Sequence, residues 1–357
     1  MVHDKVFIIA EAGVNHNGNY DRAFELIDVA AESCVDAIKF QTFNTKHLVT
    51  RNAFKAPYQV TKTGKNESQY QMLANLELSH GVHRKLKAYS ERKGLQFMST
   101  AFDLVSLEFL VTDLQLELLK IPSGELTNGP LLLAYGQSGR DLILSTGMST
   151  TEEVHEALML VSFGLSGGTD PTAEKNFELF DWRTKQGLLR SKVLLLHCTS
   201  QYPAPAHSIN LHAISTMMDE YGLRVGYSDH SEGITIACAA VALGARVIEK
   251  HFTLDKTLPG PDHSASLEPR ELQEMVKAIR SIEKALGDGV KKPQEAEREN
   301  REASRKSLVA AKDIAEGETF TVANIVAKRP GTGRSPMSYW SVLGTQAKKQ
   351  YKADDLI

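Results

Sequence analysis

The residues of this chain with the clearest capacity for chemistry stand at or just after the ends of short apolar runs. In chain order they are Glu11 with Asn15 and His16, Lys39 with Gln41, Ser99 with Thr100, Lys120 with Ser123 and Glu125, Ser145 with Thr146, His197 with Cys198, Ser228 with Asp229 and His230, and Glu249 with His251. A single polar ending carries little information, because strands must stop and polar residues favour turns. Eight such endings in order indicate side chains that act on one shared ligand.

Two lysines and several hydroxyls in this set predict a pocket for an anion. The predicted pocket residues are Lys39, Thr100, Lys120, Ser123, Ser145 and Ser228. Ammonium groups supply positive charge and hydroxyls supply short, oriented donors, which suits a phosphorylated or carboxylated substrate. The alternative is that each lysine extends to solvent or pairs with a nearby carboxylate.

The two histidines that follow the seventh and eighth runs, His230 and His251, predict a site for one divalent cation. Two neutral imidazoles, completed by water and substrate oxygens, suit Mn²⁺, with Mg²⁺ or Co²⁺ as alternatives, whereas a closed zinc site would need more protein ligands. The acidic neighbours Asp229 and Glu249 strengthen this interpretation. The competing interpretation is that each histidine is structural.

Two further residues remain open between a chemical and a structural role. Asp262 lies in the loop 257–263, where two prolines restrict the chain, and its carboxylate could accept hydrogen bonds from sugar hydroxyls. The same loop also fits a surface turn in which Ser264 or Ser266 caps a helix. Cys198 has no evident base partner in the sequence, which favours a pocket wall over a nucleophile.

The elements that must position these residues alternate between short branched runs and longer segments of helical period. The apolar runs are 6–10, 37–40, 96–99, 118–121, 141–144, 193–196, 224–227 and 246–250. Helix candidates lie between them, such as 20–33 and 268–286, the latter ended by Gly287. Eight repeats over about 285 residues predict a (β/α)8 TIM barrel, in which strand ends converge on one mouth. A doubly wound parallel sheet is the structural alternative.

The chain is expected to divide into a TIM-barrel catalytic domain at 1–286, a linker at 287–304 and a small loop-rich domain at 305–357. Composition becomes polar and charged over 291–305, which indicates a linker or an exposed helix. Short apolar runs broken by glycine and proline follow. The stretch 164–185 is interpreted as an insertion without assigned chemistry.

Composition argues against several classes of partner. Charged residues make up 24% of the 357 residues and the formal net charge is only -3, so we expect neither a nucleic-acid partner nor a membrane partner. Three scattered cysteines fit a reducing, cytoplasmic location better than a disulfide framework. The first residues lack the pattern of a signal peptide, and no segment is apolar for long enough to span a bilayer.

Nine ordered motifs give the chain a close resemblance to the N-acetylneuraminate (sialic acid) synthase family, which includes bacterial legionaminate and pseudaminate synthases. They are EAGVNHNG at 11–18, IKFQTF at 38–43, KIPSGE at 120–125, ILSTGM at 143–148, HCTSQYP at 197–203, YSDH at 227–230, IEKHFT at 248–253, PGPDH at 259–263 and KRPG at 328–331. The resemblance covers nearly the whole chain. It implies a TIM barrel followed by a C-terminal antifreeze-like (SAF) domain.

The resemblance also implies roles for individual residues. Phosphoenolpyruvate would bind through Lys39, Thr100, Lys120, Ser123, Ser145, Ser200 and Ser228, the metal through His230 and His251, and the sugar through Gln41, Glu125, Tyr202 and Asp262. Arg329 would reach the sugar from the other subunit of a domain-swapped homodimer. Ser200 departs from several relatives, which carry asparagine against the phosphate.

The implied reaction condenses phosphoenolpyruvate with N-acetylmannosamine and water to give N-acetylneuraminate and phosphate. Glu11 or Glu125 would move protons beside the metal-binding histidines. The main alternative is an N,N'-diacetyllegionaminate synthase that uses 2,4-diacetamido-2,4,6-trideoxymannose, because the segments 55–59 and 287–292 resemble those enzymes equally well. Remoter alternatives are a barrel aldolase with a Schiff base on Lys39 or Lys120, and a carbohydrate- or ice-binding protein.

Overall fold

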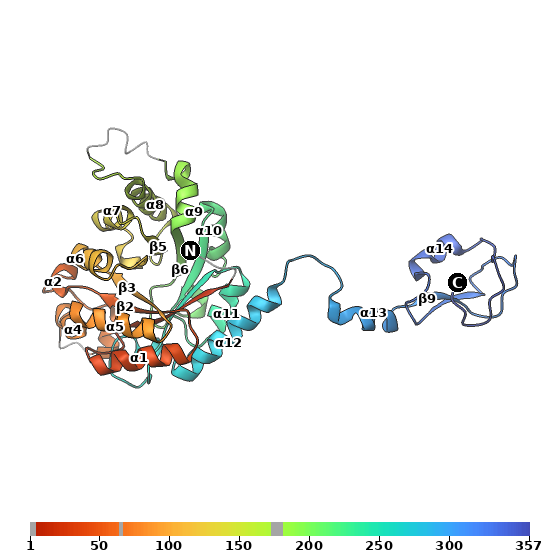
Figure 1. The fold of residues 1–357 in the computed structure, drawn as a ribbon, viewed down its shortest axis with the longest axis horizontal. Helices are drawn as coiled ribbons and strands as arrows, with labels where there is room; N and C mark the ends of the chain where they lie inside the picture. Colours follow the sequence, from red (N-terminus) through yellow and green to blue (C-terminus); the bar gives the residue numbers. More distant parts are fainter. Residues whose placement is uncertain (1–4, 64–66, 173–180) are drawn as a thin grey trace. The chain divides into compact units, whose positions relative to one another are not determined.

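The computed structural model describes residues 5–63, 67–172 and 181–357. The chain forms two compact units, Met1–Gly287 and Asp288–Ile357, each with its own hydrophobic core (Figure 1).

The first unit is a closed barrel of eight parallel strands in chain order, surrounded by helices (Figure 1). The strands are β1 (Phe7–Gly13), β2 (Ala37–Thr42), β3 (Gln96–Ala101), β4 (Leu118–Ile121), β5 (Asp141–Ser145), β6 (Val193–Cys198), β7 (Arg224–Asp229) and β8 (Val247–His251). The predicted TIM barrel is confirmed, and the doubly wound alternative is wrong because β8 pairs with β1 and closes the sheet.

Most strands run further than the apolar runs that predicted them. The backbone ladder continues through the polar residues, since Glu11 of β1 pairs in register with Lys39 of β2 and with His251 of β8. Ladder hydrogen bonds use only backbone groups, so a polar side chain does not end a strand. The chemically capable residues therefore stand on the strands as well as in the loops after them.

Helices cover the outside of the barrel. They are α1 (Tyr20–Glu32), α2 (Thr45–Leu48), α3 (Pro57–Thr63), α4 (Gln69–Leu76), α5 (His80–Arg92), α6 (Leu104–Glu108), α7 (Gly129–Gln137), α8 (Thr151–Leu165), α9 (Gln186–Lys192), α10 (Ala213–Tyr221), α11 (Thr235–Ala242) and α12 (Pro269–Leu286). The Asn19 side chain caps α1, and Gly287 follows the last residue of α12 with φ 62°, as the sequence predicted for that end.

Side chains alternate between two environments along each strand. The inward face begins with an apolar floor of Ile9, Ala37, Met98, Leu118, Ile143, Leu194, Leu196 and Val247. Residues between them, such as Ile8 and Ile38, face outward into a second core against the helices. Because successive side chains point to opposite faces, the residue two places after each floor residue also points inward. A polar layer thus lies directly above the floor.

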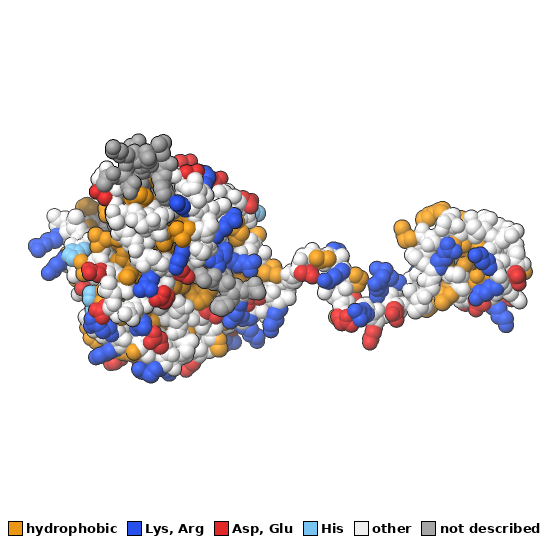
Figure 2. Space-filling view, turned by 45° about the horizontal axis from the view of Figure 1, so that its top comes forward, with side chains coloured by type: hydrophobic (Ala, Val, Ile, Leu, Met, Phe, Trp, Pro, Cys, Tyr) orange, Lys and Arg blue, Asp and Glu red, His pale blue; other side chains and the backbone are white. Residues whose placement is uncertain are grey.

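The second unit is small. Strands β9 (Ser307–Ala310) and β10 (Ile325–Lys328) pair antiparallel, and α14 (Tyr339–Val342) contributes Val342 to the core. The stretch before β9 contains the exposed helix α13 (Arg298–Ser304), and charged side chains crowd its surface (Figure 2).

The expected insertion at 164–185 is described only in part. Helix α8 ends at Leu165 and a 3₁₀ turn covers Trp182–Lys185, while 173–180 lie outside the described residues. In the described part of the chain, no helix has the length and apolar character needed to cross a bilayer.

Candidate active site

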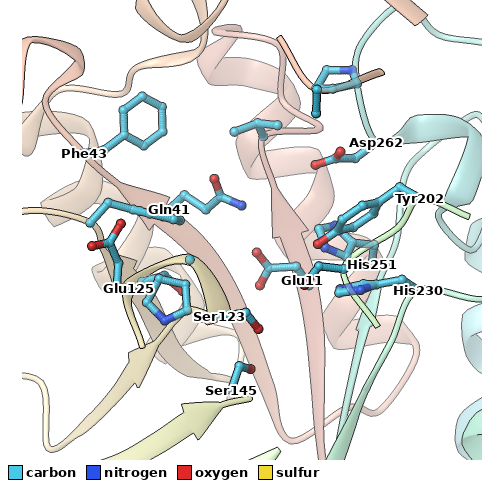
Figure 3. A pocket seen from close by; sticks show the side chains of 18 of the residues that line it. Glu11, Gln41, Phe43, Ser123, Glu125, Ser145, Tyr202, His230, His251 and Asp262 are labelled. Carbon is cyan, nitrogen blue, oxygen red and sulfur yellow. The ribbon is translucent and has the colours of Figure 1, made fainter. Parts of the chain in front are cut away.

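A cavity of about 440 Å³ opens at the carboxyl ends of the barrel strands (Figure 3). It brings together all the predicted site residues that belong to the barrel. They are Glu11, Lys39, Gln41, Thr100, Lys120, Ser123, Glu125, Ser145, Ser200, Tyr202, Ser228, His230, His251 and Asp262. The polar layer forms the bottom of this cavity. Its members Glu11, Lys39, Thr100, Lys120 and Ser145 each stand two residues after an inward-facing apolar residue of the layer beneath.

Four buried charged side chains form a chain across the floor. The Lys39 Nζ lies 2.5 Å from Glu11 Oε2 and 3.6 Å from Glu249 Oε2, and the Lys120 Nζ lies 3.3 Å from Glu249 Oε1. Lys39 also donates to the Thr100 hydroxyl at 3.0 Å, and the Ser228 hydroxyl donates to Glu249 at 2.8 Å. The lysines therefore do pair with carboxylates, as the structural alternative held, but they do so inside the cavity.

The charges of this chain follow from burial and from its own contacts. Burial raises the pKa of Glu11 to about 7, although Lys39 acts against it. Burial alone would also raise the pKa of Glu249, but Lys120 and Lys39 hold that pKa well below its ordinary value. For Lys39, burial lowers the pKa, and the carboxylates of Glu11 and Glu249 outweigh burial and raise it. Burial lowers the pKa of Lys120, and both lysines contact the firmly ionised Glu249, an arrangement that an added anion would stabilise.

A cradle of small polar groups lies beside the lysines. The Gly147 amide donates to the Ser123 hydroxyl at 3.0 Å, and the Ser145 hydroxyl is buried with no hydrogen-bond partner among the described residues. A side chain on Gly147 would place its Cβ 2.5 Å from Ser200 Oγ and 2.8 Å from Ser123 Oγ. Glycine is therefore required for these hydroxyls to converge, and they can donate to a phosphate or carboxylate.

The two predicted metal ligands, His230 and His251, lie next to each other on one side of the cavity (Figure 3). The ring centroids of His230 and His251 lie 5.5 Å apart, and the Tyr202 ring lies 4.1 Å from that of His230 at a tilt of 33°. His230 Nδ1 donates to the Thr199 carbonyl at 2.7 Å. Its Nε2 lies 3.5 Å from the Ser228 hydroxyl, but that hydroxyl donates to Glu249 at 2.8 Å, so the Nε2 lone pair can serve a cation. Burial lowers the pKa of both imidazoles, so both are neutral near pH 7.

The surroundings of His251 fit a cation. Its buried Nδ1 has no hydrogen-bond partner among the described residues. Gly13, with φ 53°, leaves open the space where a Cβ would lie 3.3 Å from both Glu11 Oε1 and the His251 ring. The unpaired His251 nitrogen and the Glu11 carboxylate border this open space. They suit a divalent ion whose coordination shell is completed by oxygen ligands. No cluster of three or more His, Cys, Asp or Glu ligands occurs within the described ranges, so water or substrate would have to complete the shell.

The expected sugar contacts occupy other parts of the cavity. Glu125 accepts a hydrogen bond from Asn128 Nδ2 at 2.7 Å, and Gln41 stands two residues beyond Lys39 on the same strand face. Asp262 is buried rather than set in a surface turn, and burial raises its pKa to about 7. Its backbone carbonyl accepts from the Ser266 hydroxyl at 2.8 Å, which helps to fix the loop.

Some polar strand-end residues face away from the cavity. Asp229 pairs with Lys250 at 2.9 Å, so its expected support of the metal site is not seen. His197 Nε2 donates to the Ile209 carbonyl at 2.6 Å, and the ring packs against Tyr227. Asn15 donates to the Phe252 carbonyl and to the Ser266 hydroxyl, which ties the loop after β8 to the loop after β1. Cys198 lines the cavity as a wall residue, and burial raises the pKa of its thiol.

Two groups of cavity residues go beyond the sequence prediction. Glu249 is central to the charge chain, although the sequence suggested it only as a neighbour of the metal site; its spacing of two residues from His251 was the available signal. An apolar side of the cavity comes from residues to which the sequence predicted no chemical role. Arg329, by contrast, lies exposed in the second unit, where its Nε donates to the Ser304 carbonyl at 3.0 Å.

Comparison with known proteins gives consistent matches. The model of the NeuB family matches residues 26–291, and the model of the SAF domain matches residues 305–357. The chain is 47% identical to an N,N'-diacetyllegionaminic acid synthase from Campylobacter jejuni, over 99% of both chains. It is 42% identical to an enzyme of the same name from Legionella pneumophila, over 97% of this chain and 92% of that one. The crystal structure of an N-acetylneuraminic acid synthetase from Leptospira borgpetersenii matches with a TM-score of 0.67 and 36% identity, over 83% of this chain and 90% of that one.

Proposed function

This chain belongs to the NeuB family and ends in a SAF domain, and from that membership we propose that it joins phosphoenolpyruvate to an N-acylated hexosamine to make a nonulosonic acid. The resemblance inferred from the motifs is confirmed by the family match and by the named relatives. The observation that carries the proposal is the convergence of two buried lysines, several hydroxyls and two neutral histidines on one cavity.

The relatives favour one of the two expected acceptors. The sequence favours N-acetylmannosamine slightly, but the two relatives with the identities given above are named for N,N'-diacetyllegionaminic acid. The expected alternative is therefore the better choice, and we infer that the acceptor is 2,4-diacetamido-2,4,6-trideoxymannose.

Phosphoenolpyruvate fits the positively charged side of the cavity. Lys39 and Lys120 supply charge to its carboxylate and phosphate, and Thr100, Ser123, Ser145, Ser200 and Ser228 supply hydroxyls around them. Carbon 3 then attacks the aldehyde carbon of the open-chain sugar, water adds at carbon 2, and phosphate leaves with cleavage of its bond to that carbon. The lysines stabilise the charge that develops on the phosphate and carboxylate oxygens.

Proton transfer falls to the carboxylates at the cavity wall. Glu11 has a pKa of about 7, so it can give or take a proton near neutral pH, whereas Glu125 stands on the opposite side with Gln41 (Figure 3). Glu11 is the better candidate to protonate the oxygen of the former aldehyde. Gln41, Glu125, Tyr202 and Asp262 would hold the sugar by its hydroxyl and amide groups.

His230 and His251 would hold the divalent metal, which we propose is Mn²⁺. When bound there, the metal would supply Lewis-acid polarisation of the aldehyde. The neutral state of both rings and the unpaired His251 Nδ1 support this assignment.

We also propose that two copies of the chain form a domain-swapped homodimer, in which Arg329 of each copy reaches the sugar in the other. The second unit exposes Met337 at 83% and Trp340 at 75%, an apolar surface that suits burial against another copy. A cytoplasmic location, expected from the few cysteines, stays a prediction.

Phosphate release provides the test of the reaction. The purified chain is incubated with Mn²⁺, phosphoenolpyruvate and either acceptor, and the product is identified by its mass. Release of phosphate that depends on the acceptor, with a nine-carbon product, is expected. Absence of turnover with both sugars would overturn the proposal. Borohydride treatment with substrate should leave the protein mass unchanged, because the alternative aldolase would trap an adduct on Lys39 or Lys120.

A complementation experiment tests the dimer. Arg329→Ala and His230→Ala chains are each expected to be inactive alone. If Arg329 acts across subunits, a mixed dimer contains one site with both wild-type groups, so mixing should restore activity. A monomer in sedimentation, or no recovery in verified mixed dimers, would contradict the domain swap.

A further inference from the structure

One side of the cavity is apolar and has no part in the chemistry proposed above. It is formed by residues in and beside α2, by α4 and by the residue that follows β3. Its residues, here called the apolar wall, are Phe43, Leu48, Val49, Met72, Leu73 and Phe102.

The wall is preformed but not fully covered. Phe43 and Met72 are buried and pack with Val14 and Leu76 in a separate hydrophobic cluster. The Phe43 and Phe102 rings meet edge to face, with centroids 6.1 Å apart. Leu48, Val49, Leu73 and Phe102 are only half-buried, although they line the cavity. Apolar surface left facing a cavity favours a ligand with apolar groups of its own.

The wall lies opposite the reacting groups. In Figure 3, Phe43 stands on the far side of the pocket from His230 and His251, and Gln41 and Glu11 lie between them. Ser123 and Ser145 lie lower in the same view, on the side proposed for phosphoenolpyruvate. A sugar whose aldehyde carbon lies at the histidines and which extends past Gln41 would place its far carbons at the apolar wall.

The two candidate acceptors differ only at those far carbons. N-acetylmannosamine carries hydroxyls at carbons 4 and 6, whereas the trideoxy sugar carries an acetamido group at carbon 4 and a methyl at carbon 6. A hydroxyl against the wall would lose its hydrogen bonds to water, but a methyl would not. Gln69, the first residue of α4, lines the same cavity and offers an amide that can pair with the acetamido group.

We propose that the apolar wall binds the carbon-6 methyl and the 4-acetamido group of the acceptor and selects a 2,4-diacetamido-2,4,6-trideoxyhexose over N-acetylmannosamine. This specificity rests on the proposed synthase function. An apolar pocket rejects an analogue with an added hydroxyl by no more than about a hundredfold. We expect kcat/KM to favour the trideoxy sugar by about ten- to a hundredfold.

The test changes the polarity of the wall while keeping its shape. Leu73→Asn keeps the branched outline of the side chain in a smaller volume and places an amide at the wall. The ratio of kcat/KM for the trideoxy sugar to that for N-acetylmannosamine should fall about tenfold, while KM for phosphoenolpyruvate stays unchanged. Both sugars are assayed on the same preparation, so a partly unfolded variant leaves the ratio intact.

Leu78→Ala is the matched control. Leu78 is buried in the segment between β2 and α5 but does not line the cavity, so its truncation should lower stability and leave the ratio at the wild-type value. Phe102→Leu, a milder change in the wall, should shift the ratio in the same direction as Leu73→Asn.

The possible outcomes separate the two proposals. If the wild-type chain turns over neither sugar, the synthase function itself fails. If it turns over the trideoxy sugar and both wall variants reduce the two acceptors equally, the function stands and the role of the wall is wrong. Equal wild-type efficiency with both sugars would also overturn the role of the wall.

Discussion

Two buried lysine–carboxylate groups lie on opposite faces of the barrel sheet, and both include a residue of β8. The inward group joins Glu11, Lys39, Glu249 and Lys120 at the cavity floor. The outward group pairs Lys250 of β8 with Asp229 of β7, between the sheet and the helices. Both groups are almost completely buried, so burial alone does not tell a site from a structural ion pair.

The two groups differ in how many of the polar atoms in and around them have hydrogen-bond partners. Lys250 donates to Asp229 at 2.9 Å and to the Ser231 carbonyl at 2.5 Å. The other oxygen of Asp229 accepts from the Ser231 amide and hydroxyl at 2.8 and 2.6 Å. On the inward side, two lysines share one firmly ionised carboxylate, and the Ser145 hydroxyl and His251 Nδ1 have no partner among the described residues. Unsatisfied polar groups around a cavity mark the place where a ligand completes the network.

The largest effect should come from the inward histidines. His230→Ala and His251→Ala are each expected to lower kcat by about a thousandfold or more, because they remove the proposed hold on the cation at the reacting aldehyde. Phosphate release measures the loss, and thermal unfolding should change little. Chelation with EDTA should have the same effect, and full activity in excess EDTA would refute the role of a metal.

The outward pair should behave in the opposite way. Lys250→Met leaves the Asp229 carboxylate buried without its cation, so the free energy of unfolding should fall by about 3–5 kcal/mol. Urea unfolding measures this loss. In the double variant Lys250→Met/Asp229→Leu, much of the stability should return, because no unpaired charge remains. If Lys250→Met kept its stability but lost kcat, the outward pair would not be purely structural, and the proposed difference between the two faces of the sheet would be wrong.

A buried histidine outside the cavity, His16, is expected to have a smaller effect on stability than the Lys250–Asp229 pair. His16 accepts a hydrogen bond from the Gly18 amide at 3.0 Å, and burial lowers its pKa to about 3. The folded protein thus holds His16 neutral, whereas the unfolded chain binds a proton below about pH 6.5. Its contribution to stability is complete above pH 6.5 and is lost as the pH falls toward 3.

Comparison of the wild type with His16→Asn isolates this effect, since asparagine keeps an acceptor for the Gly18 amide. Between pH 7.5 and 5.0, the wild type should lose about 2 kcal/mol more unfolding free energy than the variant. Equal losses in urea unfolding at the two pH values would show that His16 is not held neutral by the fold.

The smallest effect concerns one unsatisfied hydroxyl. Ser145→Ala removes a single donor from the cradle, so KM for phosphoenolpyruvate should rise about tenfold, the equivalent of one hydrogen bond to an anion. Stability should be unchanged or slightly higher, because a buried group without a partner has been removed. A clear loss of stability would place Ser145 with the structural polar groups instead.

Much of the fold and of the candidate site followed from the sequence. The run 118–121 matches β4 at both ends, and α12 ends before Gly287 as expected. Polar residues after each apolar run predicted the lining of the cavity, since parallel strands in a barrel bring their carboxyl ends together. The doubly wound alternative could not be excluded in the same way, because closure depends on the contact between β1 and β8, which are far apart in the chain.

By itself, the sequence determined which residues carry charge, hydroxyl and imidazole groups and that they stand at strand ends. Only the tertiary structure decided which face of each strand opens onto the cavity. Lys250 and Glu249 are adjacent in the chain, yet one pairs behind the sheet and the other in the cavity, because a strand turns successive side chains to opposite faces. The apolar wall likewise exists only because α2 and α4 fold over the mouth, a long-range contact that no local pattern of residues encodes.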